Sequence, residues 1–227
     1  MGLTSSPPPL LVLSDRRQAG RLGLVATMAA AVAGGARAVV LREKDLERAE
    51  RRELGCALVE VLAGAGGTVL LAGADIELAR MIGAGGVHLA SADPFPEERS
   101  GLVVGRSCHD AGELCVAGAE GVDYATVSPM FASSSKPGYG PAITTAGLTE
   151  LVGGTTVAVV ALGGITPANA RSCLDAGATG VAVMGAVMGA DDPAAATAEL
   201  LTAISSRSHL DLAPSAVAIT TAEGART

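Results

Sequence analysis

The sequence contains no tryptophan and only two phenylalanines and two tyrosines, so aromatic residues make up 2% of the chain while hydrophobic residues make up 49%. The core must therefore be built mainly from alanine, valine, leucine and glycine. Branched aliphatic side chains of this kind fill the interior of eight-stranded β/α barrels in stacked layers. The composition is therefore compatible with such a barrel.

Positive charge is also scarce, because 16 Lys and Arg residues face 23 Asp and Glu residues and the net charge is -7. The chain lacks the basic footprint typical of nucleic-acid-binding proteins. An anionic ligand would have to be held by a few local cations and backbone N–H groups, because no positive field covers the whole surface. We therefore expect a small-molecule ligand and no nucleic-acid partner.

Long apolar runs are missing as well, so we expect no membrane span and no membrane partner. The first residues, MGLTSSPPP, lack the charged and apolar regions of a signal peptide, which favours a cytoplasmic protein. The four cysteines show no C-x-x-C spacing. A zinc site or a disulfide framework is therefore not expected.

Short apolar runs alternate with helical segments along the chain. The strands that we predict are residues 10–13, 38–41, 68–71, 86–89, 102–106, 121–127, 157–162 and 180–184. The predicted helices cover about 21–33, 46–62, 75–81, 111–117, 144–151, 167–175 and 192–204. Unbroken alternation of this kind predicts one α/β domain, a single (β/α)8 TIM barrel.

The predicted barrel spans residues 9–205, between a flexible leader of residues 1–8 and a flexible tail of residues 206–227. One connection departs from the pattern. The segment SADPFPEERSG, between the fourth and fifth strands, has two prolines and only about ten residues, which leaves room for one helical turn at most. We therefore predict a shortened connection there.

The last two predicted strands both end in glycine, at Gly163-Gly164 and at Gly185. Strand ends that open into glycine, with a helix N-terminus close behind, present backbone N–H groups to anions. Barrels bind phosphate at the ends of strands seven and eight. The pattern therefore predicts a phosphorylated ligand, although either junction alone could be a simple connector.

Two cations follow the second strand directly. Arg42 and Lys44 lie two residues apart, so an extended backbone points both the same way and turns Glu43 aside. Such a pair would clamp an anion. The alternative is a solvated charge cluster that opens the next helix, but cations at a helix N-terminus are unfavourable unless an anion compensates them.

Other polar residues follow the fourth, fifth and sixth strands and would share the same barrel mouth. Ser107 and His109 again lie two apart, and a histidine there can transfer protons near neutral pH. A lone histidine is often structural, which is what we expect of His88 inside the fourth strand. The remaining candidates at these strand ends are Asp93, Ser133, Ser135 and Lys136.

The segment SPMFASSSKPGYGPA, which contains the last three of these candidates, is long and rich in Ser, Gly and Pro. Long loops with this composition often act as lids over a ligand. The alternative is a solvated linker.

Taken together, these residues resemble the family of thiamine phosphate synthase and the TenI thiazole tautomerase, which are small phosphate-binding barrels. The matching stretches span most of the chain from Val39 to Ala186, and they are VVLREK, GAGGVHLASAD, VGRSCHD, VDYATVSPMFASSSK, ALGGITPAN and GVAVMGA.

In the synthase, the resemblance implies, a magnesium-bound aminopyrimidine diphosphate loses pyrophosphate, and the nitrogen of thiazole phosphate attacks the carbocation left behind. The implied pyrophosphate contacts are Arg42, Lys44, Lys136 and Ser107, with Asp93 as a magnesium ligand. The implied contacts to thiazole phosphate are Ser133, Ser135, Gly164 and the backbone of Met184 and Gly185. His109 matches a histidine that acts as acid and base in the tautomerase.

Three positions depart from the synthase pattern. A glutamine of the synthase is Val40 here, and its Asn-Asp pair after the third strand falls on Gly73 and Ala74. The pyrimidine side of the site has thus lost two amides and one of two carboxylates. Asp75, the next residue, remains an open candidate to replace the missing carboxylate.

This asymmetry favours a tautomerase that aromatises thiazole phosphate by proton transfer through His109 without a metal. The alternative is a synthase that uses Mg²⁺, which one carboxylate and substrate phosphates can still hold. A third reading is a regulator that binds thiamine phosphate or its precursor without catalysis. Relatives make a homodimer a reasonable expectation.

Overall fold

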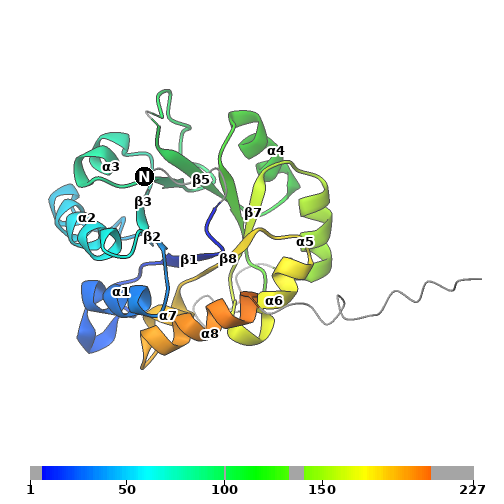
Figure 1. The fold of residues 1–227 in the computed structure, drawn as a ribbon. Coiled ribbons are helices and arrows are strands. Elements are labelled where there is room, and N and C mark those ends of the chain that lie inside the picture. Colours follow the sequence, from blue (N-terminus) through cyan, green and yellow to red (C-terminus); the bar gives the residue numbers. More distant parts are fainter. Residues whose placement is uncertain (1–6, 100, 133–140, 206–227) are drawn as a thin grey trace, which may run out of the picture.

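The computed structural model describes residues 7–99, 101–132 and 141–205, and within them eight parallel strands form one closed barrel (Figure 1). The strands are β1 (Leu10–Leu13), β2 (Ala38–Leu41), β3 (Thr68–Ala72), β4 (Gly86–Leu89), β5 (Val103–Cys108), β6 (Tyr124–Val127), β7 (Ala158–Leu162) and β8 (Gly180–Val183). Closure comes from the pairing of β1 with β8, in which Leu10 lies opposite Val181. The predicted (β/α)8 barrel is confirmed.

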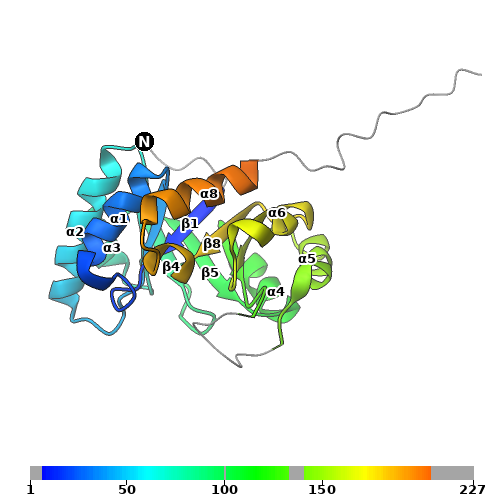
Figure 2. The same ribbon diagram turned by 90° about the horizontal axis from the view of Figure 1, so that it is seen from below.

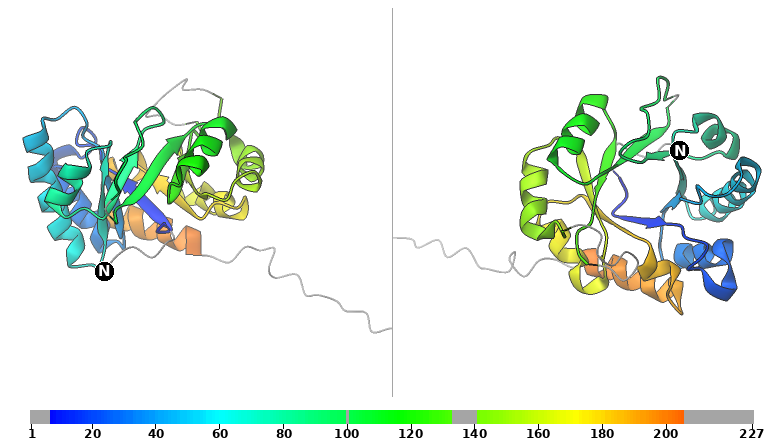
Figure 3. Two further views of the ribbon diagram at one scale, coloured as in Figure 1. Left: turned by 90° about the horizontal axis from the view of Figure 1, so that it is seen from above. Right: turned by 180° about the vertical axis from the view of Figure 1, so that it is seen from behind.

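Helices form an outer layer around these strands, as Figures 2 and 3 show. They are η1 (Gly20–Leu22), α1 (Leu24–Ala33), α2 (Arg48–Ala63), α3 (Ile76–Ile82), α4 (Ala111–Glu120), α5 (Thr144–Gly153), α6 (Pro167–Asp175), α7 (Gly185–Met188) and α8 (Pro193–Ser205). The sequence pattern predicts each α-helix except α7, which is too short to show a helical period. The predicted helix over residues 21–33 is divided at Gly23, where φ is 74°, into η1 and α1. None of the described helices is long and apolar enough to cross a membrane.

The strands separate two apolar layers. One buried cluster draws only on strand residues, such as Leu11, Val40 and Leu70, and therefore fills the barrel interior. The other combines the intervening strand residues with helix residues, such as Leu58 and Leu78, and lies between the strands and the helices. Alternate residues of every strand thus point inward, which decides which side chains reach the barrel mouth.

The ends of two strands differ from the prediction. β5 continues through Ser107 to Cys108, so Ser107 belongs to the strand itself. β6 begins at Tyr124 and not at Gly121, because Gly121 ends α4 with a left-handed backbone, φ 72°. Glycine adopts this conformation without strain.

The connection between β4 and β5 contains no helix in the residues that the structure describes there, 90–99, 101 and 102. This confirms the shortened connection. Arg99 forms an ion pair with Asp123, whose carboxylate also accepts a hydrogen bond from the N–H of Val104 at 2.7 Å. The segment is thereby anchored to the beginning of β5 and β6. The predicted leader falls mostly, and the predicted tail wholly, outside the described residues.

Candidate functional site

All eight strands are parallel, so their carboxyl ends share one rim of the barrel. Active sites of such barrels lie at this rim. The sequence candidates in the described residues follow β2, β4, β5, β7 and β8 or end β5, and they are Arg42, Lys44, Asp93, Ser107, His109, Gly163, Gly164, Met184 and Gly185. The remaining three, Ser133, Ser135 and Lys136, lie outside the described residues.

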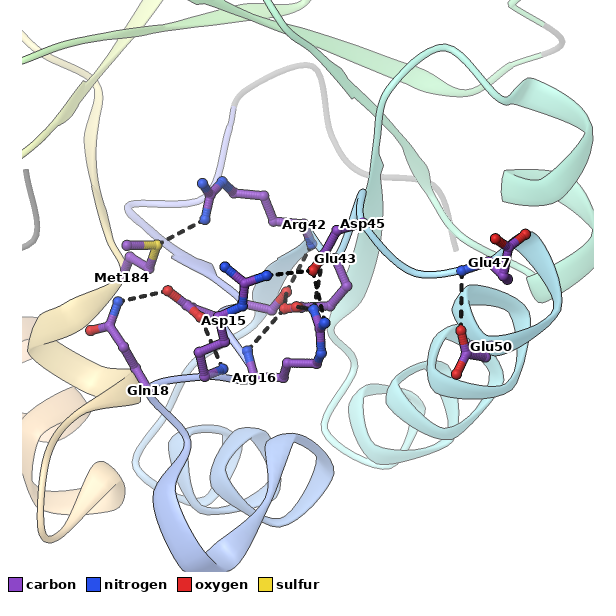
Figure 4. Close-up of polar contacts among 11 residues, drawn as sticks. Asp15, Arg16, Gln18, Arg42, Glu43, Asp45, Glu47, Glu50 and Met184 are labelled. Atoms are coloured by element: carbon purple, nitrogen blue, oxygen red, sulfur yellow. Dashed lines mark hydrogen bonds and ion pairs between the residues drawn. The ribbon is translucent and has the colours of Figure 1, made fainter.

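Arg42 leaves the end of β2 and reaches across the mouth to β8. Its backbone N–H donates to Ser14 Oγ at 2.8 Å, and its exposed guanidinium donates from Nη1 to the sulfur of Met184 at 3.1 Å (Figure 4). A thioether is a weak acceptor. An anion at the mouth would therefore displace Met184 from the guanidinium with little loss.

Glu43 points away from the mouth, as alternation along the chain predicts. Its carboxylate is 5% exposed and accepts hydrogen bonds from Ser14 Oγ at 2.7 Å and from Arg16 Nη1 at 2.9 Å. Arg16 also pairs with Asp45, and this hydrogen bond holds the pKa of the Asp45 carboxyl well below its usual range. Figure 4 shows this network beside Arg42. It fixes the backbone from which both cations leave.

Lys44 reaches in the other direction, toward β4. Its Nζ donates to Oδ2 of Asp93 at 3.0 Å, and the same oxygen accepts from the N–H of Ala90 at 2.8 Å. Burial opposes ionisation of Asp93, but these two hydrogen bonds outweigh it and hold the pKa of the carboxyl below its ordinary value. Asp93 is therefore a carboxylate at the rim.

The two cations do not form one side-by-side clamp, which corrects the expectation from alternation alone. Arg42 extends toward β8 and Lys44 toward β4, because each takes the partner nearest to it at the rim. A Cβ atom at Gly73 would lie 3.8 Å from Cε of Lys44. The ammonium group thus lies beside the end of β3, where the resemblance expects an amide and a carboxylate.

Asp75 does not take the place of that carboxylate. Its side chain caps α3 by accepting from the N–H of Leu78 at 2.8 Å, and it pairs with Arg48 at 2.9 Å. The hydrogen bond from Arg48 holds the pKa of Asp75 below its ordinary value. In the described part of the chain, no group of three or more His, Cys, Asp and Glu side chains is arranged to hold a metal ion. A magnesium ion at this rim would therefore need oxygen ligands from a bound phosphate group in addition to Asp93.

Arg106, which is not among the candidates identified from the sequence, supports Asp93 indirectly. Its guanidinium is almost fully buried, and Nη1 donates to the carbonyl oxygens of Ala90 at 3.2 Å and Ser91 at 2.8 Å. This holds the turn whose N–H group binds Asp93. Arg106 thus helps to position Asp93, although its own side chain faces away from the mouth.

Ser107 faces the barrel interior near the rim. Its Oγ lies 3.0 Å from Nε2 of His88, a buried ring on β4. The ring of His88 is almost fully buried inside the barrel. Cys108, the next residue, is buried in the outer layer, and burial raises the pKa of its thiol to about 12.

His109 follows β5 directly and is one-third exposed. One oxygen of Glu113 accepts from its backbone N–H at 2.7 Å and contacts its ring Nδ1 at 2.9 Å. A carboxylate only accepts hydrogen bonds, so Nδ1 carries the hydrogen. Glu113 belongs to the first turn of α4 and thus orients the imidazole at the rim, a partner that the sequence analysis did not identify.

The glycine corner after β7 supports a neighbouring loop as well as facing the rim. Gly163 and Gly164 have left-handed backbones, with φ 100° and 67°. A Cβ atom at Gly164 would lie 2.7 Å from the carbonyl oxygen of Ala132, and the N–H of Phe131 donates to the carbonyl of Gly163 at 3.0 Å. The corner therefore holds the segment that leads into the serine-rich loop.

The corner after β8 is a short helix. α7 begins at Gly185, and the N–H of Val187 donates to the carbonyl of Met184 at 3.1 Å. The first N–H groups of any helix lack an intrahelical acceptor. α7 thus begins at the end of β8 next to Met184, the residue that the Arg42 guanidinium contacts.

Comparison with known proteins identifies the family of the chain. A protein from Roseiflexus castenholzii named thiamine-phosphate synthase is 38% identical over 195 residues, which cover 83% of this chain and 85% of that protein. One from Geobacter sulfurreducens, named putative thiamine-phosphate synthase, is 38% identical over 81% of this chain and 88% of its own.

Among solved structures, thiamine phosphate pyrophosphorylase from Pyrococcus furiosus is 31% identical and superimposes with a TM-score of 0.77 over 86% of this chain and 95% of that one. The family model described as thiamine monophosphate synthase matches residues 10–187. This match runs from the first residue of β1 into α7 and includes every candidate site residue. The chain therefore belongs to the thiamine monophosphate synthase family.

Proposed function

We propose that this chain is a thiamine-phosphate synthase that joins hydroxymethylpyrimidine diphosphate to thiazole phosphate and releases pyrophosphate. The observation that carries the proposal is the spread of two cations along one rim, from the β8 corner at Arg42 to the β4 end at Lys44. The names of the relatives favour the same reaction. No comparison singles out the tautomerase that the missing pyrimidine contacts favour.

In this reaction the bond between the pyrimidine methylene carbon and the diphosphate oxygen breaks, and a bond forms between that carbon and the thiazole nitrogen. The oxygen leaves with the electron pair as pyrophosphate. Arg42 and Lys44 would neutralise the charge that develops on it, since preorganised cations stabilise a departing anion most when they are already in place. Ser107 would add a hydrogen bond.

The change of Asn-Asp to Gly73-Ala74 supports this role for Lys44. The aspartate of that pair would add a carboxylate after β3, which Ala74 lacks. The Cβ position of Gly73, where the asparagine would stand, lies 3.8 Å from Cε of Lys44, and Asp93 is the one carboxylate that pairs with Nζ in the described residues. More of the positive charge is then available to pyrophosphate.

The thiazole phosphate would bind at the corners after β7 and β8. Gly164 and Gly185 would offer backbone N–H groups, and the Arg42 guanidinium lies against Met184, next to the β8 corner. Ser133, Ser135 and Lys136 would contribute from the loop after β6. Both phosphorylated substrates would then bind at one rim.

Magnesium would enter with the diphosphate as part of the substrate. Mg²⁺ is usually held by one or two carboxylates together with substrate phosphates. Asp93 would be the protein carboxylate that contacts it, and Mg²⁺ would supply additional charge neutralisation at the diphosphate. Because a second carboxylate is missing, we expect a higher magnesium requirement than a two-carboxylate site would have.

A tautomerase remains the second candidate because His109 is built for proton transfer. Its Nδ1 is held by Glu113 at 2.9 Å, and this fixes the ring at the rim. Such a carboxylate-histidine pair suits a group that takes a proton from one ring position and returns it to another. No metal is needed for this reaction.

The deciding experiment supplies the purified protein with aminopyrimidine diphosphate, thiazole phosphate and Mg²⁺ and measures pyrophosphate release. A parallel reaction contains only the non-aromatic thiazole carboxylate phosphate and measures its aromatisation. The proposal predicts pyrophosphate release that requires both substrates. Aromatisation alone, abolished by His109→Asn, would establish the second candidate, and binding without either turnover would establish a regulator.

A further inference from the structure

A chain of hydroxyl groups surrounds the buried ring of His88 inside the barrel. Nδ1 of His88 lies 2.9 Å from Oη of Tyr124 on β6, and Nε2 lies 3.0 Å from Oγ of Ser107 on β5. Oγ1 of Thr126 is a longer contact of Nε2, at 3.4 Å. His88 and Tyr124 are 6% and 2% exposed, whereas Ser107 is only half-buried and lies nearest the rim.

The backbone of β5 makes room for the tyrosine. Gly105 lies opposite Tyr124 in the strand pairing, and a Cβ atom there would overlap the hydroxyl end of the tyrosine ring. The rings of Tyr124 and His88 stack with their centroids 5.5 Å apart. The hydroxyl of Tyr124 is thereby confined to one place, beside His88 Nδ1.

The confined hydroxyl decides which nitrogen of His88 carries the hydrogen. Within the described residues, Nδ1 of His88 is the one acceptor that the Tyr124 hydroxyl reaches. If Nδ1 carried the hydrogen, the phenolic hydrogen would be buried without an acceptor, which costs about 1–3 kcal/mol. The hydroxyl therefore donates to Nδ1, and the hydrogen of the neutral ring is on Nε2.

The direction of the next hydrogen bond follows from this tautomer. Nε2–H donates to Ser107 Oγ, its nearer partner. The oxygen of Ser107 is therefore the acceptor in this hydrogen bond, and the hydroxyl hydrogen takes no part in it. The contact with Thr126 at 3.4 Å is secondary in either tautomer, because one ring nitrogen makes one strong hydrogen bond. Ser107 thus keeps a hydrogen that it can donate toward the mouth.

We propose that Tyr124 and His88 are positioning residues. They set the direction of each hydrogen bond from Tyr124 through His88 to Ser107, here called the proton order, so that Ser107 presents its hydroxyl hydrogen to the anionic leaving group. The identity of that anion rests on the function proposed above, whereas the proton order does not. A serine whose oxygen already accepts a hydrogen bond is a stronger donor, since hydrogen bonds in a chain polarise one another.

A neutral His88 is a requirement of this arrangement. Burial, with a smaller contribution from the nearby charge of Lys44, lowers the pKa of His88 to about 4, although Asp93 opposes this. The ring of His88 is therefore neutral at neutral pH.

The proton order can be observed directly, without substrate. The full chain labelled with ¹⁵N-histidine gives long-range proton–nitrogen correlations for its three histidines, and His88→Gln identifies the signals of His88. We expect the neutral tautomer with hydrogen on Nε2 at neutral pH. The tautomer with hydrogen on Nδ1, or an imidazolium ring, would overturn the proposal.

Binding of inorganic pyrophosphate with Mg²⁺, measured by calorimetry, tests whether Ser107 donates its hydroxyl hydrogen to an anion at the barrel mouth. Tyr124→Phe should weaken binding about 3- to 10-fold, the value of one hydrogen bond. In a Ser107→Ala background the same change should have less than about a twofold effect on binding, because Tyr124 acts on the anion only through Ser107. Equal effects in both backgrounds would mean that Tyr124 acts on stability alone and would refute the proposal.

Thr126→Val is the matched control, since it removes the longer contact to the same ring from the same strand. We expect the tautomer and the pyrophosphate affinity to stay within about twofold of those of the original chain. If pyrophosphate does not bind to any of these proteins, the proposed synthase function fails, and the tautomer of His88 still decides the proton order.

Discussion

At the scale of single residues, the ammonium group of Lys44 carries much of the proposed chemistry. It is paired with Asp93 at 3.0 Å, and both side chains are partly exposed, 44% and 27%. Ion pairs at the surface contribute about 0–1 kcal/mol. A multiply charged diphosphate can therefore draw Lys44 away from its carboxylate at small cost.

Replacing Lys44 with methionine should weaken pyrophosphate binding about 10- to 100-fold, since hydrogen bonds to charged groups contribute about 1.5–3 kcal/mol. Calorimetric titration with pyrophosphate measures this. Arg17→Met is the control, because it removes one positive charge that pairs with Asp45 and is 76% exposed. Similar losses in both variants would point to net charge and not to the position of Lys44.

At the scale of elements, the corner between β7 and α6 must satisfy two demands. It faces the rim with glycine N–H groups, and it packs against the segment after β6. The capping box at the start of α6 stabilises the corner from the other side, since the N–H of Thr166 donates to Asn169 and Asn169 Nδ2 donates to the carbonyl of Gly164 at 2.9 Å. Both demands require glycine at position 164.

Gly164→Ala tests this packing against a matched control. Gly66 has φ 68°, close to the 67° of Gly164, but a Cβ atom there would meet nothing within 4 Å. Gly66→Ala should cost only the left-handed backbone strain, about 1 kcal/mol. Gly164→Ala should cost about 1–3 kcal/mol more, because the methyl group meets backbone oxygens that cannot move freely. Urea unfolding measures the loss of unfolding free energy in both variants. Equal losses would show that the backbone next to Gly164 moves to accommodate the methyl group.

The pairing of β5 with β6 gives a second prediction at this scale. Gly105→Ala would place a methyl group on the tyrosine ring and displace it from His88, which should destabilise the protein by about 1–3 kcal/mol. Gly153→Ala, at the end of α5 with nothing within 4 Å of its Cβ position, should be neutral or slightly stabilising. Thermal unfolding followed by circular dichroism compares the two, and an unaffected Gly105→Ala protein would mean that the ring is not confined.

At the scale of the whole molecule, a histidine inside the barrel makes stability depend on pH. Burial lowers the pKa of His88 from 6.5 to about 4. Between these two values the unfolded chain binds a proton that the folded protein does not. The contribution of His88 is therefore fully present above pH 6.5 and is lost as the pH falls toward 4.

The size of this loss is on the order of 3 kcal/mol, at 1.36 kcal/mol for each pKa unit. Urea unfolding at several pH values should show a decrease in unfolding free energy from pH 6.5 to 4 that is steeper in the original chain than in His88→Gln. Carboxyl groups titrate in the same range in both proteins, so the difference between them isolates His88. Parallel curves would contradict the buried neutral ring.

Much of the fold is predictable from the sequence because each β/α unit is local. Apolar runs and glycine stops identify β1, β2 and β4 with their ends as the structure has them. α7 is missed because its four residues cannot show a helical period. The predicted strand ends at Arg106 and misses the extension of β5 to Cys108, because Ser107 is polar and interrupts the apolar run.

The candidate site is predictable in its location but not in its contacts. Strand ends at one rim follow from parallel topology, so the positions of Arg42, Lys44 and His109 could be placed in advance. The partners of Arg42 and Lys44 could not, because Met184 lies 142 positions from Arg42 and Asp93 lies 49 positions from Lys44. Only the assembled barrel brings such pairs together.

The most direct test of a common site for both phosphorylated groups is a crystal structure of the protein with Mg²⁺, pyrophosphate and thiazole phosphate. The account predicts pyrophosphate oxygens in contact with Arg42 and Lys44, and the thiazole phosphate at the N–H groups of Gly164 and Gly185, on the same rim. Ligands bound elsewhere, or a pyrophosphate that neither cation touches, would contradict it.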